Sequence, residues 1–143
     1  IKNNASGMCL IASENEVNYS SCDEHSDEQR WKMMYKGDYD NTKKRKNAQI
    51  KSVNNGKCIF KDSQMGGQLN ENNLLLKDCD AAYAGSNINS EFFITNNDKD
   101  SYTLNVKSDS RYCIYDRTTK KPKVHSCTAD NKSYYSINGL ELS

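Results

Sequence analysis

Three short stretches of the chain share one pattern, in which a turn-prone triplet is followed by a cysteine and two apolar residues: SGMCLI (6–11), NGKCIF (55–60) and SRYCIY (110–115). Each is followed by a second half-signature that contains another cysteine: VNYSSCD (17–23), LLLKDCD (74–80) and KVHSCT (123–128). The features recur in the same order, which indicates an internal repeat. A single repeat of about 45 residues cannot bury its apolar face alone, so we expect three repeats to share one core.

A third shared feature follows the second cysteine, where an aromatic residue precedes an apolar residue by two positions. The pairs are Trp31 with Met33, Phe92 with Ile94, and Tyr135 with Ile137. Alternation with a period of two is typical of a half-buried strand, and IKSV (50–53) and YTLNV (102–106) are also strand-like. The sequence therefore predicts an all-β fold in one domain, residues 1–143, with unequal repeats at about 1–46, 47–98 and 99–143.

The composition indicates that the core needs covalent support. Hydrophobic residues make up 35% of the chain and the mean hydropathy is -0.96, but six cysteines are present. An even number of cysteines fits an oxidising, secretory compartment, and each disulfide would contribute about 3 kcal/mol of stability. The residues alone leave the pairing open. The sequence has no CxxC motif, and His25 and His125 have no ligand-like spacing from the cysteines, so we expect no metal and no cofactor.

The charge balance limits the class of partner. The chain has 20 Lys and Arg against 19 Asp and Glu, a formal net charge of +1, which argues against a protein built to hold nucleic acid. It contains no apolar run of the ~18 residues that a transmembrane helix needs, so we expect no transmembrane segment. We expect a secreted or cell-surface protein, and the start at IKNN suggests a mature or excised segment.

Gln29-Arg30-Trp31 matches the Gln-x-Trp signature of the ricin B-type lectins, which the chain resembles over nearly its whole length. Ser90-Glu91-Phe92 and Ser133-Tyr134-Tyr135 are degenerate forms of the signature. The resemblance implies a β-trefoil in which Trp31, Phe92 and Tyr135 are core residues. It also implies one disulfide within each repeat, namely Cys9–Cys22, Cys58–Cys79 and Cys113–Cys127.

The same resemblance locates a candidate sugar site in the third repeat. Family members that bind galactose-like sugars place an aspartate two residues after the first cysteine, where this chain has Ile11, Phe60 and Tyr115. They place a stacking ring two residues before the second cysteine, where this chain has Ser20, Lys77 and His125. We therefore predict a site with His125 as the platform, Asp116 as a displaced acceptor and Asn131 as a nearby amide. The alternative is a solvated turn without a ligand.

Two clusters of basic residues are candidates for binding anionic glycans by charge. Lys43, Lys44, Arg45 and Lys46 lie in a polar segment that we interpret as a protruding loop, and Lys120, Lys121 and Lys123 surround Pro122. A plain solvated loop is the alternative.

Two functional hypotheses remain, and neither is catalytic. The isolated histidines and paired cysteines provide no activated nucleophile, so we expect a protein that is not an enzyme. The first hypothesis is a carbohydrate-binding, lectin-like recognition module at a cell or particle surface, with a glycan or glycoprotein as partner. The second is a trefoil with decayed sugar sites that binds protein within a secreted assembly.

Overall fold

The computed structural model describes residues 1–62, 72–81, 88–98, 101–116, 121–127 and 131–142. Three repeats of four strands each make up the fold. They comprise β1 (Lys2–Asn3), β2 (Met8–Ser13), β3 (Glu16–Ser21) and β4 (Trp31–Tyr35); β5 (Arg45–Ser52), β6 (Lys57–Lys61), β7 (Asn72–Asp78) and β8 (Glu91–Asp98); and β9 (Ser101–Val106), β10 (Tyr112–Asp116), β11 (Pro122–Ser126) and β12 (Tyr135–Ser136). A 3-10 helix precedes the fourth strand of each repeat: η1 (Asp27–Gln29), η2 (Ile88–Ser90) and η3 (Asn131–Ser133). The predicted all-β trefoil is confirmed.

The second and third strands of each repeat form an antiparallel hairpin with the same register. The first cysteine of each hairpin lies opposite the residue two positions before the second cysteine, in the pairs Cys9–Ser20, Cys58–Lys77 and Cys113–His125. The second cysteine follows at the end of the hairpin and bonds back to the first. The three predicted disulfides are confirmed, with Cα–Cα distances of 5.0, 4.9 and 5.1 Å for Cys9–Cys22, Cys58–Cys79 and Cys113–Cys127.

The core takes equivalent residues from all three repeats. The residue after each first cysteine, namely Leu10, Ile59 and Ile114, has an exposed fraction of 0%. Its cross-strand partner is also buried, as Tyr19, Leu76 and Val124 respectively. Phe92 and Tyr135 are fully buried as predicted, so period-two alternation places one apolar row per hairpin in the shared interior.

Two glycines in the repeated triplets are required by backbone geometry. Gly7 and Gly56 each lie two residues before the first cysteine and have φ angles of 72° and 74°. Each glycine N–H closes a turn, donating to the carbonyl oxygens of Asn3 and Ser52 at 2.8 and 2.9 Å. A side chain at either position would strain the turn, since this left-handed region favours glycine. The Gly-x-Cys pattern therefore marks the turn that leads into the hairpin of the first and of the second repeat, whereas the third repeat has Arg111 at this position.

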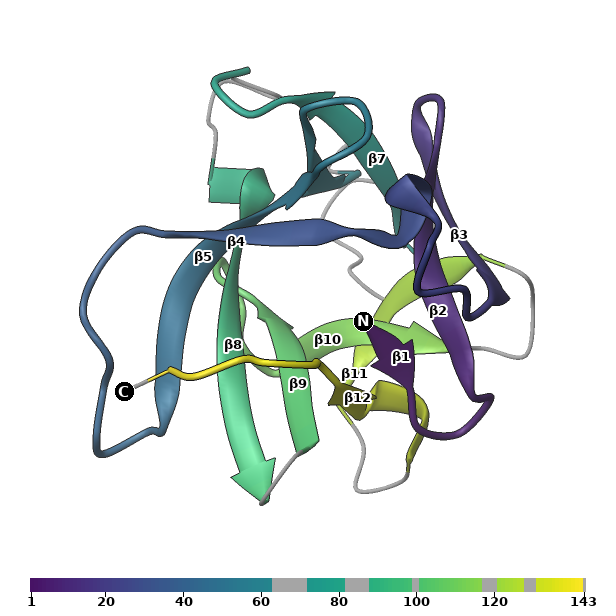
Figure 1. Ribbon diagram of the computed structural model, residues 1–143. Helices are drawn as coiled ribbons and strands as arrows, with labels where there is room; N and C mark the ends of the chain where they lie inside the picture. The colour runs from purple at the N-terminus through teal and green to yellow at the C-terminus, as the bar shows by residue number, and fades with distance from the viewer. Residues whose placement is uncertain (63–71, 82–87, 99–100, 117–120, 128–130, 143) are drawn as a thin grey trace.

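The first and fourth strands of the repeats form a barrel, in the paired order β1, β12, β9, β8, β5 and β4. Figure 1 shows β5, β8 and β9 running alongside one another, with the C-terminal segment passing across β8 and β9 in front. The approximate boundary expected near residues 46 and 47 lies within β5, which begins at Arg45 and pairs there with Thr95. The predicted boundary at 98 and 99 falls between β8 and β9.

Candidate functional site

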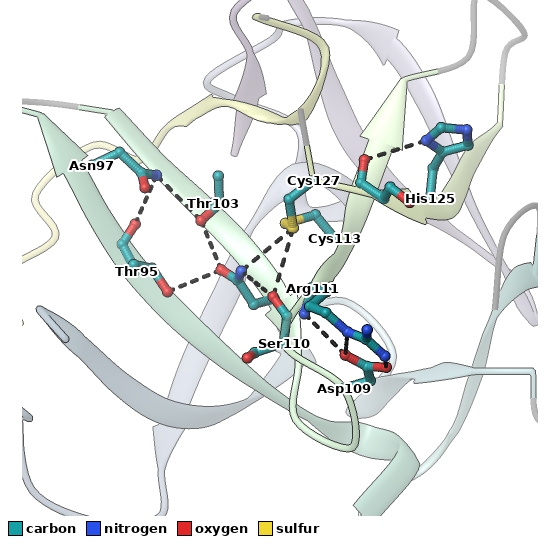
Figure 2. Close-up of a disulfide and its surroundings, with 11 residues drawn as sticks. Thr95, Asn97, Thr103, Asp109, Ser110, Arg111, Cys113, His125 and Cys127 are labelled. Atoms are coloured by element: carbon teal, nitrogen blue, oxygen red, sulfur yellow. Dashed lines mark hydrogen bonds and ion pairs between the residues drawn. A yellow bond between two sulfur atoms is a disulfide. The ribbon is translucent and has the colours of Figure 1, made fainter. Parts of the chain in front are cut away.

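An aromatic pair lies on the outer face of the third-repeat hairpin. The rings of Tyr115 and His125 stack with centroids 4.7 Å apart and planes inclined by 26°. Tyr115 is buried and His125 is half-buried, so the stacked imidazole is the more accessible ring of the pair. Figure 2 shows His125 on the hairpin that holds the Cys113–Cys127 disulfide, which fixes the strand that carries it. The predicted platform residue is therefore accessible and held by packing.

Polar groups from two strands continue this outer face. Lys123 lies opposite Tyr115 on one side and opposite Asn73 of β7 on the other. The Lys123 Nζ donates to Asn73 Oδ1. An ammonium has three donors, and the Asn73 amide nitrogen provides two more. We call Asn73, Tyr115, Lys123 and His125 the hairpin-face cluster.

The predicted acceptor Asp116 lies on the opposite face of the hairpin. The β10–β11 register runs without interruption from Tyr112–Ser126 to Asp116–Pro122, so alternation turns Asp116 inward with Ile114. Its exposed fraction is 6%. Burial raises the pKa of the Tyr19 and Tyr135 hydroxyls, and the charge of Asp116 raises both further. The placement of Asp116 beside His125 in one site is therefore wrong, because no bulge shifts β10.

The third predicted site residue, Asn131, begins η3. It is exposed, and its carbonyl oxygen accepts a hydrogen bond from the Tyr134 N–H at 3.1 Å. The structure gives it no contact with His125. Ligand binding by His125 or Asn131 stays a prediction.

The first basic cluster lies partly in a tight hairpin turn and partly in a strand. The predicted protruding loop is wrong for Arg45 and Lys46, which belong to β5. The Asp40 carboxylate accepts from the N–H groups of Thr42 and Lys43 at 2.9 and 3.1 Å, and these bonds lower the pKa of Asp40. Lys43 and Lys44 are exposed in this turn. Arg45 and Lys46 belong to β5, where their cationic groups lie 3.7 Å from the Phe93 ring centroid and 4.3 Å from that of Tyr35.

The second basic cluster is described in part. Lys120 lies outside the described residues. The Lys121 ammonium pairs with Glu16 at 3.1 Å, whereas Lys123 belongs to the hairpin-face cluster. Lys121 and Lys123 therefore contact different side chains, namely Glu16 and Asn73.

Trp31 is not a fully buried core residue, contrary to the prediction. It packs against the core but is half-buried, and its indole N–H donates to the Leu10 carbonyl oxygen at 3.0 Å. Gln29, the first residue of its signature, closes the preceding loop by donating to the Ser21 carbonyl oxygen and accepting from the Asp23 N–H, at 2.7 and 2.8 Å. Trp31 lines an open cavity of about 960 Å³, which the sequence analysis missed.

The described residues provide neither a candidate metal site nor a membrane-spanning helix. Within the described residues, no group of three or more His, Cys, Asp and Glu side chains could hold a metal ion. In the same part of the chain, no helix has the length and apolar character needed to cross a membrane.

Comparisons with solved structures show the fold. A designed three-fold symmetric protein, ThreeFoil, aligns with a TM-score of 0.74 at 15% identity, covering 97% of this chain and 96% of the other. A salivary protein of the cysteine and tryptophan-rich family from Culex gives 0.70 at 17% identity, covering 93% and 86%. The cytolethal distending toxin of Haemophilus ducreyi gives 0.54 at 16% identity, covering 95% and 86%.

Comparisons of sequence show the family. No curated protein matches the chain. The model of the cytolethal distending toxin A/C domain matches residues 1–103, which is more than half of the 143 residues. The chain therefore belongs to the cytolethal distending toxin A/C domain family.

Proposed function

We propose that this protein is a carbohydrate-binding module that recognises glycans at a cell surface without catalysing a reaction. The trefoil fold, the toxin-domain family and the resemblance to ricin B-type lectins support a recognition role. Three disulfides and the same family support an extracellular location. The six cysteines are all paired, so none offers a thiol nucleophile.

One observation carries the proposal, the stacked pair of Tyr115 and His125 beside Lys123. The apolar C–H face of a sugar packs against an aromatic ring, and the outward face of His125 provides such a ring on a rigid support. Hydroxyls at the edge of that sugar then reach the donors of Lys123 and Asn73. The site is a combination of one apolar platform and convergent polar groups, which is typical of small-ligand sites.

The charge of the hairpin-face cluster selects the class of glycan. Asp116, the acceptor expected for a neutral sugar diol, faces the interior, whereas Lys123 is a cationic donor on the outer face. A charge-assisted hydrogen bond from Lys123 to a sugar carboxylate or sulfate is about twice as strong as a neutral one. We propose that the bound glycan carries an acidic group.

A glycan array followed by titration of the best acidic glycan tests this function. We expect His125→Ala and Lys123→Gln each to weaken binding about tenfold, which corresponds to about 1.4 kcal/mol. His25→Ala is the matched control, because the His25 side chain is 87% exposed and belongs to another repeat. Melting temperatures near that of the wild type would show that the variants fold. Unchanged affinity in both site variants, or selective binding of neutral glycans, would contradict the assignment.

The non-catalytic role has its own test, a hydrolase screen of the array glycans. We expect no turnover, and release of free sugar above the rate of a heat-treated sample would contradict the proposal.

Binding of a protein is a second candidate function, favoured by a different observation. The cavity beside Trp31 is lined by apolar side chains that include Met33, Ile137 and Leu140, and it contains none of the hairpin-face residues. A protein could therefore bind there while a glycan occupies the third-repeat hairpin.

A further inference from the structure

The outer wall of the barrel carries an arginine whose hydrogen-bond donors are unused. Arg45 is half-buried in β5, and its guanidinium carbon lies 3.7 Å from the centroid of the Phe93 ring on the neighbouring strand β8. The Arg45 side chain forms no hydrogen bond or ion pair with a described residue, and its Nε is buried without a partner. Buried polar groups are nearly always hydrogen-bonded, so this guanidinium is a candidate for binding a ligand.

The ring of Phe93 holds this guanidinium in place. A planar cation is attracted to the face of an aromatic ring and stacks on it. Because the stack already fixes the long side chain of Arg45, a ligand does not have to immobilise it. With Nε buried, the two terminal amino groups of Arg45 are the donors left for a ligand. Two parallel donors of this kind match the two oxygens of a carboxylate.

The carboxylates of the protein that lie near Arg45 are already engaged. The Asp40 carboxylate accepts hydrogen bonds from two N–H groups of its own turn, at 2.9 and 3.1 Å. Glu91, two positions before Phe93 on the same face of β8, forms an ion pair with Lys107 at 3.1 Å. No described carboxylate pairs with Arg45, so its positive charge favours an anion from outside the chain.

An oxygen that can only accept hydrogen bonds lies opposite Arg45. Thr95 is the cross-strand partner of Arg45, and its hydroxyl donates to Asn105 Oδ1 at 2.9 Å. The Asn105 amide nitrogen donates to the Ser110 carbonyl oxygen at 2.8 Å, so Oδ1 is the acceptor and the Thr95 hydroxyl is the donor. Figure 2 shows the hydroxyls of Thr95 and Thr103 bonded to this same oxygen. The Thr95 oxygen therefore offers only lone pairs to a ligand.

The two groups together select the chemistry of the ligand. Arg45 matches a carboxylate, and Thr95 matches a hydroxyl that donates. The Cβ atoms of directly opposite residues lie about 5 Å apart, so one ligand of the size of a sugar ring reaches both. A uronic acid carries a carboxylate and hydroxyls on one ring. A sulfate or phosphate group would instead place a further negative oxygen toward the lone pairs of Thr95.

We propose that Arg45 and Thr95 form a binding site for the uronic acid of a glycan, and we call Arg45, Phe93 and Thr95 the wall site. The terminal amino groups of Arg45 donate to the carboxylate, and a neighbouring hydroxyl of the sugar donates to the Thr95 oxygen. Binding depends on the fork of the guanidinium and not on charge alone. The wall site shares no residue with the hairpin-face cluster, so it is a second site beyond the proposed one.

The test titrates a tetrasaccharide of hyaluronan, which carries uronic acid and no sulfate, into the whole chain. Nuclear magnetic resonance of the backbone amides reports on each site separately. We expect saturable shifts at the amides of Arg45, Phe93 and Thr95. A carboxyl-reduced tetrasaccharide keeps the rings and their hydroxyls but loses the charge, and we expect it to bind about tenfold more weakly at these amides.

Four variants complete the test. Arg45→Lys keeps the charge but loses the fork, so it should bind about tenfold more weakly, and Thr95→Val keeps the shape but removes the acceptor, so it should bind severalfold more weakly. Lys44→Gln is the matched control, because Lys44 is exposed and adjacent in sequence, and it should bind like the wild type. Melting temperatures near that of the wild type would show that the variants fold.

The fourth variant, Lys123→Gln, alters the hairpin-face cluster and should leave the shifts at the wall site unchanged. The wall site and the hairpin-face cluster can therefore fail independently. Wild-type affinity in Arg45→Lys or in Thr95→Val would overturn the proposal. Equal binding of the carboxyl-reduced tetrasaccharide, or the absence of saturable shifts at the wall site, would overturn it as well, and neither of these two results depends on a variant that folds.

Discussion

The hydroxyl oxygens of Tyr19 and Tyr135 lie 2.6 Å apart in the core, although the two residues are separated by 116 positions in the sequence. Tyr19 belongs to the hairpin of the first repeat and Tyr135 to β12 of the third. The bond therefore joins the first and last repeats inside the barrel. It also provides each buried phenol with a partner, which a tyrosine in a core usually needs.

Removing both members of this pair should cost less than the sum of the two single removals. We expect Tyr135→Phe to lower the free energy of unfolding by about 1–3 kcal/mol, because it leaves the buried Tyr19 hydroxyl without this partner. Tyr19→Phe should cost less, because the Tyr135 hydroxyl keeps its hydrogen bond with the Asn3 side chain. The double variant should lose less than the sum, since neither hydroxyl is then left unpaired. Urea denaturation of the four proteins measures this coupling, and strictly additive losses would show that the hydroxyls do not interact in solution.

The same pair predicts a loss of stability in alkali. Burial raises the pKa of Tyr19 and of Tyr135 well above the ordinary value, with the charge of Asp116 as a smaller contribution to both. Both phenols stay protonated in the folded protein at pH values where unfolded tyrosine ionises, so the folded state binds more protons. The free energy of unfolding should therefore be unaffected by these groups below about pH 10 and should fall above it.

Denaturation midpoints measured between pH 8 and pH 11 check the alkaline prediction. In the Tyr19→Phe, Tyr135→Phe double variant neither group titrates, and we expect the decline above about pH 10 to be shallower. An equal decline in the double variant and the wild type would assign the effect to other groups.

Trp31 and Phe92 occupy equivalent places in their repeats but differ in burial. Phe92 is fully buried, and Phe92→Ala should lower the free energy of unfolding by about 3–5 kcal/mol through lost burial and a cavity. Trp31 is half-buried and lines the cavity, so we expect Trp31→Ala to cost less. Chemical denaturation of the two variants compares them directly. Equal losses would mean that Trp31 is covered in solution.

The strands and most of the core were predictable because their signals are local, whereas the disulfide pairing was implied by the resemblance to ricin B-type lectins. A hairpin places its cysteines, its apolar residues and their cross-strand partners within about twenty residues of one another, as Cys58 and Cys79 illustrate with a separation of 21. Period-two alternation then predicts which face of the hairpin enters the core, and Leu10, Ile59 and Ile114 on that face are fully buried.

The candidate site was harder to predict because it depends on register and on contacts between repeats. Asp116 is adjacent in sequence to Tyr115, but a continuous β10 turns the two side chains to opposite faces. Asn73 meets Lys123 only because β7 of the second repeat pairs with β11 of the third. The placement of Trp31 likewise depends on contacts outside its own strand, such as the hydrogen bond from its indole N–H to the Leu10 carbonyl oxygen, which the Gln-x-Trp signature does not encode.

The turn between β4 and β5 makes a separate prediction about anionic glycans. Lys43 and Lys44 are exposed in the turn, whereas the guanidinium of Arg45 is held over Phe93. We expect the Lys43→Glu, Lys44→Glu double variant to elute from heparin at lower salt than the wild type, because attraction between exposed charges is screened by salt. Lys32→Glu, Lys36→Glu is the matched control, since these lysines are also exposed and the change in net charge is the same. If both double variants elute together, the retention reflects net charge, and the turn lysines have no specific part in it.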